Sequence, residues 1–397
     1  MALAQRPSRV CRRADMGKVV NRSPILMCLM RHAARRPRRY ASPSSNDREM
    51  SMRNSKGLPG RALLIAALLA TTAATAADAI EIPSPAAQAQ LLDMLEREAL
   101  YRGRVDWPAT RTRLKDAQGD PAKVRTVLAE AIGRSSGGHG SWMTPQRQQQ
   151  RVERFARENA TAAARSESDA TRARDPRIGQ VLIEGYAADP GAPPQQLQQQ
   201  NIQRAVRWQN AIREKDSTPR CGWIVDLRDN TGGNMWPMLL GVAPLLRTSA
   251  MAIEDVGSFE TADGPVRWQT TASGVRMGEA TRLDFGQPGY LPRQVGAPVA
   301  VLTGPRTASS GEATVLAFRG RAQTRSFGQP TAGVSTANVV RRLVDGSALV
   351  LTTSVMRDRN GNGDGRKIVP DQATAGDDAT VAAAEAWLLA QPACKEG

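Results

Sequence analysis

The chain has 397 residues, of which 41% are hydrophobic and 4% aromatic, and it carries a formal net charge of +16. This length is sufficient for a large hydrophobic core, and the composition excludes a fibrous or disordered protein. Most of the positive charge lies in residues 1–79, around "RHAARRPRRY", and the mildly basic remainder has no nucleic-acid-binding motif. We therefore expect no nucleic-acid partner.

The N-terminal segment has the anatomy of a signal peptide that starts near Met50 or Met52. A short basic stretch, "MSMRNSKGLPGR", precedes the apolar run "ALLIAALLATTAATA", and small residues offer cleavage sites after Ala76 or Ala79. We predict that residues 1–79 are a basic extension plus signal peptide, so the mature protein is secreted or periplasmic and is not stably inserted in a membrane. The alternative is a short membrane anchor that stays attached.

The next part of the chain is predicted to be helical. Apolar residues recur at helical spacing through residues 80–134, and Asp120 followed by Pro121 is a typical helix start. A glycine-rich turn, "SSGGHGSW", follows and contains His139. We expect an N-terminal helical region over residues 80–150 that ends with this histidine loop.

A polar linker or solvated helix is predicted over residues 151–177, and strands then alternate with helices over residues 178–397. This alternation indicates a layered α/β or α+β core. The expected strands are Ile178–Tyr186, Gly222–Arg228 and Pro298–Gly304, with hairpins near residues 252–276 and around Asp345-Gly346. Helices are expected after each of the first two strands, from about Ser310 to Arg319, and at the C-terminus with a cap at Asp377 or Asp378.

Three loops carry residues suited to chemistry. In "DLRDNTGGN", Gly232 and Gly233 follow a buried strand and leave backbone N–H groups free to face a ligand. In "GPRTASSGE", Ser309 and Ser310 stand at the start of a helix, near the positive end of its dipole. The third loop contains His139. Each feature alone is more often structural than catalytic, so their combination matters.

The motifs "GWIVDLRDNTGGNMWPM", "VAVLTGPRTASSGEATVLAFRGRAQTRSFGQPTAG" and "IVPDQ" together resemble the C-terminal processing, or tail-specific, peptidases. The resemblance covers residues 178–371 and implies a serine peptidase with a crotonase-like ββα spiral, no cofactor, and a peptide or protein substrate. It implies that Ser309 is the nucleophile. The oxyanion hole would use the backbone N–H of Ser310 and that of Gly232 or Gly233.

The general base departs from the best-known branch of this family. That branch has a lysine after its "GxPT" turn, where this chain has Val334, and a serine is a weak nucleophile without a base. Lys367 is a weaker alternative further along the chain. The tricorn-like branch takes a histidine from an upstream loop instead, which implies His139, one of only two histidines in the chain. An imidazole suits general-base work at neutral pH.

The same branch has an acid shortly before the "PD" dipeptide, which implies Asp364, with Asp358 as the fallback, as the residue that orients the imidazole. The chain order of these residues excludes an α/β-hydrolase. The segment "DRNGNGDG" also resembles the start of a calcium loop, but Val369 stands where the bidentate glutamate is required. We therefore expect no bound metal.

Several alternatives stay open. In an exported protein Cys221 and Cys394 either form a disulfide or remain separate thiols. The span from His139 to Ile178 is too short and polar for the PDZ module of most family members, so we expect none. The rival functions are a catalytically inactive protein of the same fold that binds a peptide or apolar ligand, and a cell-envelope interaction protein that uses its N-terminal helices. The sequence gives no oligomeric state.

Overall fold

The structure is a computed structural model that describes residues 81–166, 172–189, 192–249, 253–261 and 263–395. The predicted signal peptide lies outside these residues. Within them, none of the helices is both long and apolar enough to cross a bilayer.

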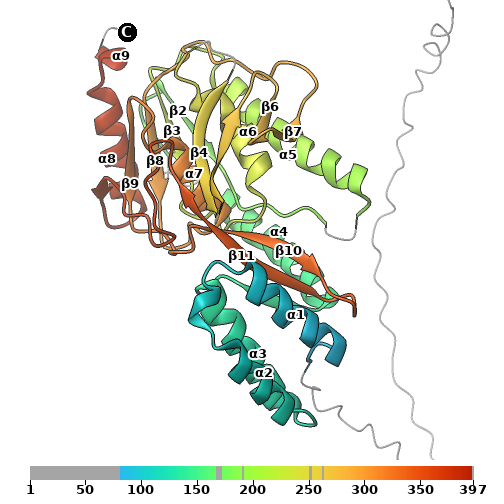
Figure 1. Cartoon of the computed structure of the whole chain (residues 1–397). Coiled ribbons are helices and arrows are strands. Elements are labelled where there is room, and N and C mark those ends of the chain that lie inside the picture. The colour runs from blue at the N-terminus through green and yellow to red at the C-terminus, as the bar shows by residue number, and fades with distance from the viewer. Residues whose placement is uncertain (1–80, 167–171, 190–191, 250–252, 262, 396–397) are drawn as a thin grey trace, which may run out of the picture. The chain divides into compact units, whose positions relative to one another are not determined.

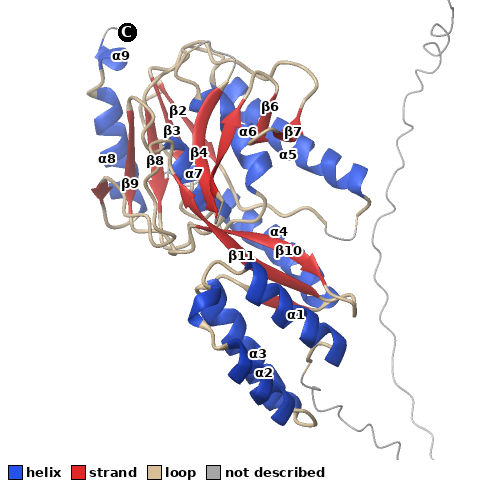
Figure 2. Ribbon diagram, viewed as in Figure 1, coloured by secondary structure: helices blue, strands red, loops and turns tan. Residues whose placement is uncertain are grey.

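A five-stranded parallel sheet forms the centre of the fold (Figure 2). Two of its three inner strands, residues 222–226 and 299–303, are buried at every residue, as expected for parallel strands covered on both faces. The strand order is β12-β9-β8-β3-β2, with bounds β2 (Ile178–Leu182), β3 (Gly222–Asp226), β8 (Val299–Thr303), β9 (Thr324–Gly328) and β12 (Gln372–Ala373).

The second sheet is antiparallel and includes a long hairpin with its turn at Asp345-Gly346, as predicted. Its strand order is β1-β11-β4-β5-β6-β7, and β10 pairs with the other side of β11. The bounds are β1 (Ser141–Met143), β4 (Glu254–Thr261), β5 (Gly264–Thr270), β6 (Gly274–Met277), β7 (Ala280–Asp284), β10 (Thr336–Arg342) and β11 (Ala348–Arg357).

Helices cover both faces of the parallel sheet (Figure 1). Helices α5 (Pro194–Lys215), α6 (Met235–Leu246) and α7 (Ser310–Phe318) share the largest apolar core with one face. Helix α8 (Asp377–Leu389), followed by the short α9 (Pro392–Lys395), packs on the other face. The predicted aspartate cap of α8 is wrong. Gly376 holds the N-cap position, and the two aspartates lie in the first turn, where their charge suits the helix dipole.

The N-terminal helices pack on the β10–β11 hairpin through a separate apolar cluster that includes Leu343, Leu349 and Leu351. The predicted start of the third helix is confirmed, because Asp120 accepts hydrogen bonds from the first turn and Pro121 is its first residue. These elements are α1 (Pro85–Glu98), η1 (Arg102–Arg104), α2 (Trp107–Asp116), α3 (Pro121–Ser136) and α4 (Pro145–Ser166).

The predicted fold class, a mixed α/β protein with a helical N-terminal region, is confirmed by these layers. The boundary predicted at residue 150 falls inside α4.

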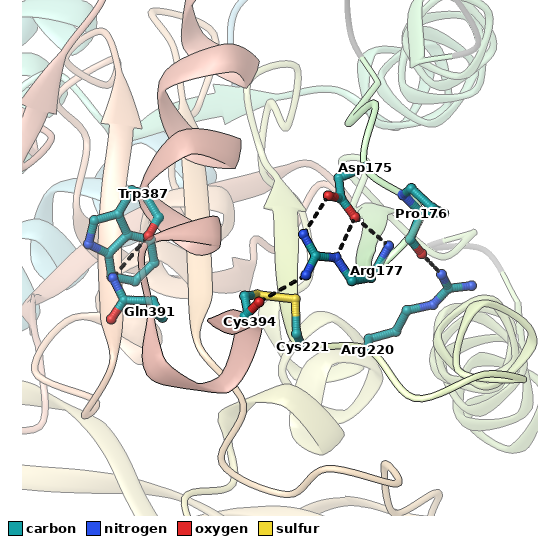
Figure 3. The surroundings of a disulfide bond; sticks show 8 residues. All are labelled: Asp175, Pro176, Arg177, Arg220, Cys221, Trp387, Gln391 and Cys394. Atoms are coloured by element: carbon teal, nitrogen blue, oxygen red, sulfur yellow. Dashed lines mark hydrogen bonds and ion pairs between the residues drawn. A yellow bond between two sulfur atoms is a disulfide. The ribbon is translucent and has the colours of Figure 1, made fainter. Parts of the chain in front are cut away.

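A disulfide joins Cys221, just before β3, to Cys394 in α9 (Figure 3). This settles the alternative that the sequence left open. Arg177 donates a hydrogen bond of 2.9 Å to the carbonyl of Cys394 and forms an ion pair with Asp175. The C-terminal helix is thus fixed to the start of the central strand.

Candidate active site

Ser309 is held in an unusual backbone conformation at the N-cap of α7. Its φ of 53° and ψ of −113° lie in a region that residues with a side chain rarely adopt. Such strain costs about 1–3 kcal/mol, persists only where the surroundings impose it, and is concentrated at functional sites. The surroundings here are two hydrogen bonds: Ala308 N–H donates to the carbonyl of Asn230 (2.9 Å), and Ser309 N–H donates to Glu312 (2.7 Å).

Glu312 lies fully buried beneath this turn. Besides Ser309 N–H, its carboxylate accepts hydrogen bonds from Thr331 Oγ1 (2.6 Å), Gly333 N–H (2.9 Å) and Val334 N–H (3.0 Å). Burial raises the pKa of Glu312, and these hydrogen bonds oppose that rise. Glu312 ends the motif "GPRTASSGE", and no role was predicted for it. The spacing Ser-x-x-Glu at a helix start was the signal that could have found it.

The Gly-Gly loop lies directly against Ser309. Gly232 has a φ of +95°, and a Cβ atom there would lie 2.9 Å from Ser309 Cβ and 2.7 Å from the Ala308 carbonyl oxygen. A glycine is therefore required for the loop to pass this close. The two loops singled out in the sequence are thus neighbours in space.

The predicted oxyanion-hole donors differ in availability. Gly232 N–H already donates to Asn230 Oδ1 (2.9 Å). Within the described residues, the N–H groups of Gly233 and Ser310 have no acceptor. Ser310 Oγ donates to the Gly233 carbonyl (2.9 Å), which fixes the peptide plane between Gly233 and Asn234. The geometry therefore favours Gly233 and Ser310 over Gly232 as the pair of donors.

His139 lies in the turn between α3 and β1. Its Nδ1 is 2.7 Å from Thr336 Oγ1, and its carbonyl accepts a bond from Asn338 Nδ2 (3.2 Å). Burial, reinforced by the nearby charge of Arg151, lowers the pKa of His139 to about 4. The imidazole is therefore neutral at pH 7. If Nδ1–H donates to Thr336, Nε2 is free to accept a proton.

A cavity of about 670 Å³ lies beside Ser309. Its wall includes Ser309, Ser310 and Gly233, and also Thr336, the hydrogen-bond partner of His139. The rest of the wall is mainly apolar. A concave, largely apolar cavity with a few polar groups is the usual form of a ligand site.

Residues 178–374, which contain the Gly-Gly loop and Ser309, match Peptidase family S41. This segment, just under half of the chain, is therefore similar to peptidase family S41. The match confirms the family expected from the motifs.

Three relatives place this S41 domain among known proteins. The nisin-resistance protein of Lactococcus lactis subsp. lactis is 35% identical over 141 residues, which are 36% of this chain and 42% of that protein. The chain thus aligns with less than half of that relative's length. A lipoprotein structure from Streptococcus agalactiae is 24% identical with a TM-score of 0.57, covering 78% of this chain and 98% of that one. A structure from Parabacteroides merdae is 18% identical with a TM-score of 0.51 and the same coverage. The two structures support the fold.

Among the described residues, no aspartate or glutamate is hydrogen-bonded to His139. Asp364 is exposed, and its carboxylate accepts a hydrogen bond from Arg366 N–H (3.0 Å) in its own turn. Asp358 is buried, and its carboxylate accepts from the backbone N–H groups of its own loop. The predicted hydrogen bond between Asp364 and His139 is absent from the described structure. Both carboxylates are hydrogen-bonded to backbone N–H groups of their own turns. The group beside Nδ1 of His139 is instead the hydroxyl of Thr336.

Val334, at the position where the resemblance places the family's lysine, donates its N–H to Glu312 (3.0 Å). Lys367 is exposed, yet its aliphatic stem lies beside Gly333, since a Cβ atom on Gly333 would lie 2.7 Å from Lys367 Cγ. Lys367 is therefore close to the turn in which the dyad lysine would stand. It is the alternative base that experiments must exclude.

Proposed function

We propose that the protein is an exported serine endopeptidase that forms an acyl-enzyme on Ser309 with His139 as general base, in the tricorn-like manner. The observation that carries the proposal is the strained backbone of Ser309 on the wall of one cavity, beside the N–H groups of Gly233 and Ser310, which have no acceptor in the part of the chain that the structure describes. Strain and free donors at one point have no structural use, but they suit attack on a carbonyl.

In this mechanism Ser309 Oγ attacks the substrate carbonyl and its proton passes to Nε2 of His139. The N–H groups of Gly233 and Ser310 receive the developing oxyanion, which is worth several kcal/mol of barrier, about 3 kcal/mol for one donor. The tetrahedral intermediate then expels the amine, which takes the proton from His139. Water, deprotonated by His139, hydrolyses the ester and restores the serine.

Thr336 is the positioning residue of this scheme. In this scheme its Oγ1 accepts a hydrogen bond from Nδ1–H of His139, which orients the ring and leaves Nε2 as the base. A neutral hydroxyl stabilises an imidazolium less than a carboxylate does, so a slow peptidase is expected.

Export is supported by the predicted signal peptide and by the names of two relatives, a lipoprotein and a nisin-resistance protein. Because one relative is named for nisin resistance, nisin belongs in the first panel of peptides to be tested as substrates. A peptide or protein substrate follows from the S41 family.

The second candidate function is peptide binding without hydrolysis. It is favoured by Val334 at the position of the family's lysine and by the missing acid partner of His139. The large apolar cavity would serve this function equally well.

A fluorophosphonate probe followed by peptide mapping separates the two functions. The enzyme labels at Ser309, loses the label in Ser309→Ala, and labels much more slowly in His139→Ala. Lys367→Met is the matched control and labels normally if His139 is the base. A folded wild-type protein that takes no label refutes the peptidase and leaves the binding function.

A further inference from the structure

The wall of the Ser309 cavity carries positive charge without compensation. Among the described residues that line it, the charged side chains are Arg151 and Arg282, and none is an aspartate or glutamate. Unpaired positive charge in a concave, mainly apolar site attracts anions strongly, because the apolar walls weaken solvent screening.

Arg151 is the more confined of the two arginines. It lies on α4 and is mostly buried, and within the described residues no carboxylate or carbonyl accepts a hydrogen bond from its guanidinium. Its guanidinium carbon lies 5.6 Å from the centroid of the Phe155 ring. Burial and the neighbouring charge of Arg154 lower the pKa of Arg151. Buried charges are normally paired, so this one lacks a partner that a ligand can supply.

Arg282 differs because it is exposed and stacks on Trp236, with 5.2 Å between the guanidinium carbon and the ring centroid. It has an aromatic partner and access to water. Arg151 therefore stands out as the charge that a bound ligand would neutralise.

The surrounding wall indicates what the rest of the ligand looks like. Trp236, Phe259, Met277 and Met356 line the cavity, and the rings of Trp236 and Phe259 pack edge to face. These side chains suit apolar groups of a ligand, at about 25 cal/mol per Å² of apolar surface buried.

We infer that Arg151 binds a carboxylate of the substrate inside the Ser309 cavity, so that the preferred substrates are peptides in which an apolar residue is followed by an acidic residue or by the C-terminal carboxylate. Arginine is suited to this role because its planar fork matches a carboxylate with two parallel hydrogen bonds. The inference deepens the proposed function and rests on it, because a bound peptide is a substrate only if the protein is a peptidase. The binding preference itself can be measured without hydrolysis.

The test is fluorescence anisotropy with the Ser309→Ala protein and four fluorescein-labelled peptides of equal length. Each has one leucine followed by Glu or Gln, and each is made with a C-terminal acid or a C-terminal amide. We expect a carboxylate to tighten binding about tenfold, the effect of one charged hydrogen-bonded contact. The peptides with Glu and those with a C-terminal acid show separately whether a side chain or the C-terminus supplies the carboxylate.

The preference for a carboxylate is expected to fall below about twofold when Arg151→Gln is added, and Arg151→Lys to retain part of it. Arg154→Gln is the matched control, because it removes the same charge from the same helix at an exposed side chain that pairs with Glu158. Equal preference in the Arg151→Gln and Arg154→Gln proteins overturns the inference, as does equal binding of all four peptides to Ser309→Ala. Thermal unfolding of each variant shows that it is folded.

Failure of the proposed function has a different signature. A wild-type protein that binds the acidic peptides tightly through Arg151, yet neither hydrolyses them nor reacts with a fluorophosphonate, is a carboxylate-selective peptide-binding protein. Hydrolysis with no effect of Arg151→Gln on KM or on binding leaves the peptidase intact and removes the role of Arg151.

Discussion

Thr336 Oγ1 lies 2.7 Å from Nδ1 of His139, where a serine-peptidase triad has a carboxylate. Thr336 is buried, in β10, and lines the same cavity as Ser309. The imidazole is thus oriented by a neutral group that adds no negative charge, and because a hydroxyl can donate or accept, this bond is compatible with either tautomer.

The first prediction concerns this hydroxyl. Thr336→Val keeps the shape of the side chain and removes the hydrogen bond, worth about 0.5–1.5 kcal/mol, so kcat/KM should fall about 2- to 10-fold. Thr336→Ser keeps the hydroxyl and should retain most of the activity. The measurement is hydrolysis of a peptide substrate, with fluorophosphonate labelling of Ser309 as a second readout. Equal rates for the valine and serine variants would show that the hydroxyl has no part in positioning His139.

The second prediction is a pH dependence. Because the pKa of His139 is lowered to about 4 by burial and Arg151, the base stays deprotonated well below its ordinary pKa of 6.5. The acid limb of kcat/KM should therefore have its midpoint nearer pH 4 than pH 6.5. Arg151→Gln removes a charge that lowers this pKa, so the midpoint should rise. If the acid limb of kcat/KM is centred above pH 7 and persists in His139→Ala, the base is a lysine.

The same pKa has a consequence for stability. Between pH 6.5 and about 4 the unfolded chain binds a proton at His139 that the folded protein does not, so the free energy of unfolding falls as the pH falls through this window. The loss is about 3 kcal/mol in total, at about 1.4 kcal/mol for each pH unit between the two pKa values. Urea unfolding at several pH values should show a shallower acid slope in His139→Gln than in the wild type.

The sequence allowed the parts of the site that are local to be predicted, because a motif such as "TASSGE" contains both the serine and the helix start that presents it. The Gly-Gly loop and Ser309 were predicted together, and the structure places a glycine Cα close enough that a Cβ would crowd Ser309. The partner of His139 could not be predicted in this way. Thr336 lies 197 residues further along the chain, and no spacing rule links a turn after a helix to one residue of a distant hairpin.

Asp364 shows the opposite error. Its place before the "PD" dipeptide suggested an orienting acid, yet the carboxylate closes its own turn onto Arg366 N–H. Asp and Asn side chains readily bond to backbone N–H groups two residues on, and such local competition is invisible in a motif. The neighbouring Gly365 does reach Thr336, since a Cβ atom there would lie 2.9 Å from Thr336 Cγ2. The segment thus approaches the residue that pairs with His139, while its carboxylate bonds within its own turn.

The third prediction concerns Glu312, whose two carboxylate oxygens accept four hydrogen bonds beneath Ser309. In Glu312→Gln the amide NH₂ would face N–H donors, so at least one buried group loses its partner, and the free energy of unfolding should fall by about 2–4 kcal/mol. Labelling of Ser309 should slow more than the loss of folded protein explains, because the strained turn is no longer fixed.

Glu279→Gln is the control for this prediction, because its side chain is fully exposed and a surface change of this kind alters stability by about 0.5 kcal/mol or less. Urea unfolding and labelling rate are measured for both variants. If Glu312→Gln labels at the wild-type rate when fully folded, the glutamate supports the fold and does not position the serine.

The fourth prediction separates stability from activity. Alternate residues of the parallel sheet face α8 on one side and α6 and α7 on the other, so the disulfide between Cys221 and Cys394 fixes a helix on the face away from Ser309. The bond closes a loop with a sequence separation of 173 residues. Removing it as the double variant Cys221→Ser/Cys394→Ser should lower the free energy of unfolding by about 2–5 kcal/mol.

Under native conditions the double variant should still label at Ser309, because the turn that holds this serine is bound by Asn230 and Glu312 and not by α8. Dithiothreitol should destabilise the wild type to the same extent and leave the double variant unchanged, which rules out an effect of the substitutions themselves. Loss of labelling in a double variant that is still folded would mean that the strain at Ser309 is transmitted through the sheet. The contact between α8 and Arg228, made by Asp377 at 2.9 Å, would then be the first link to substitute.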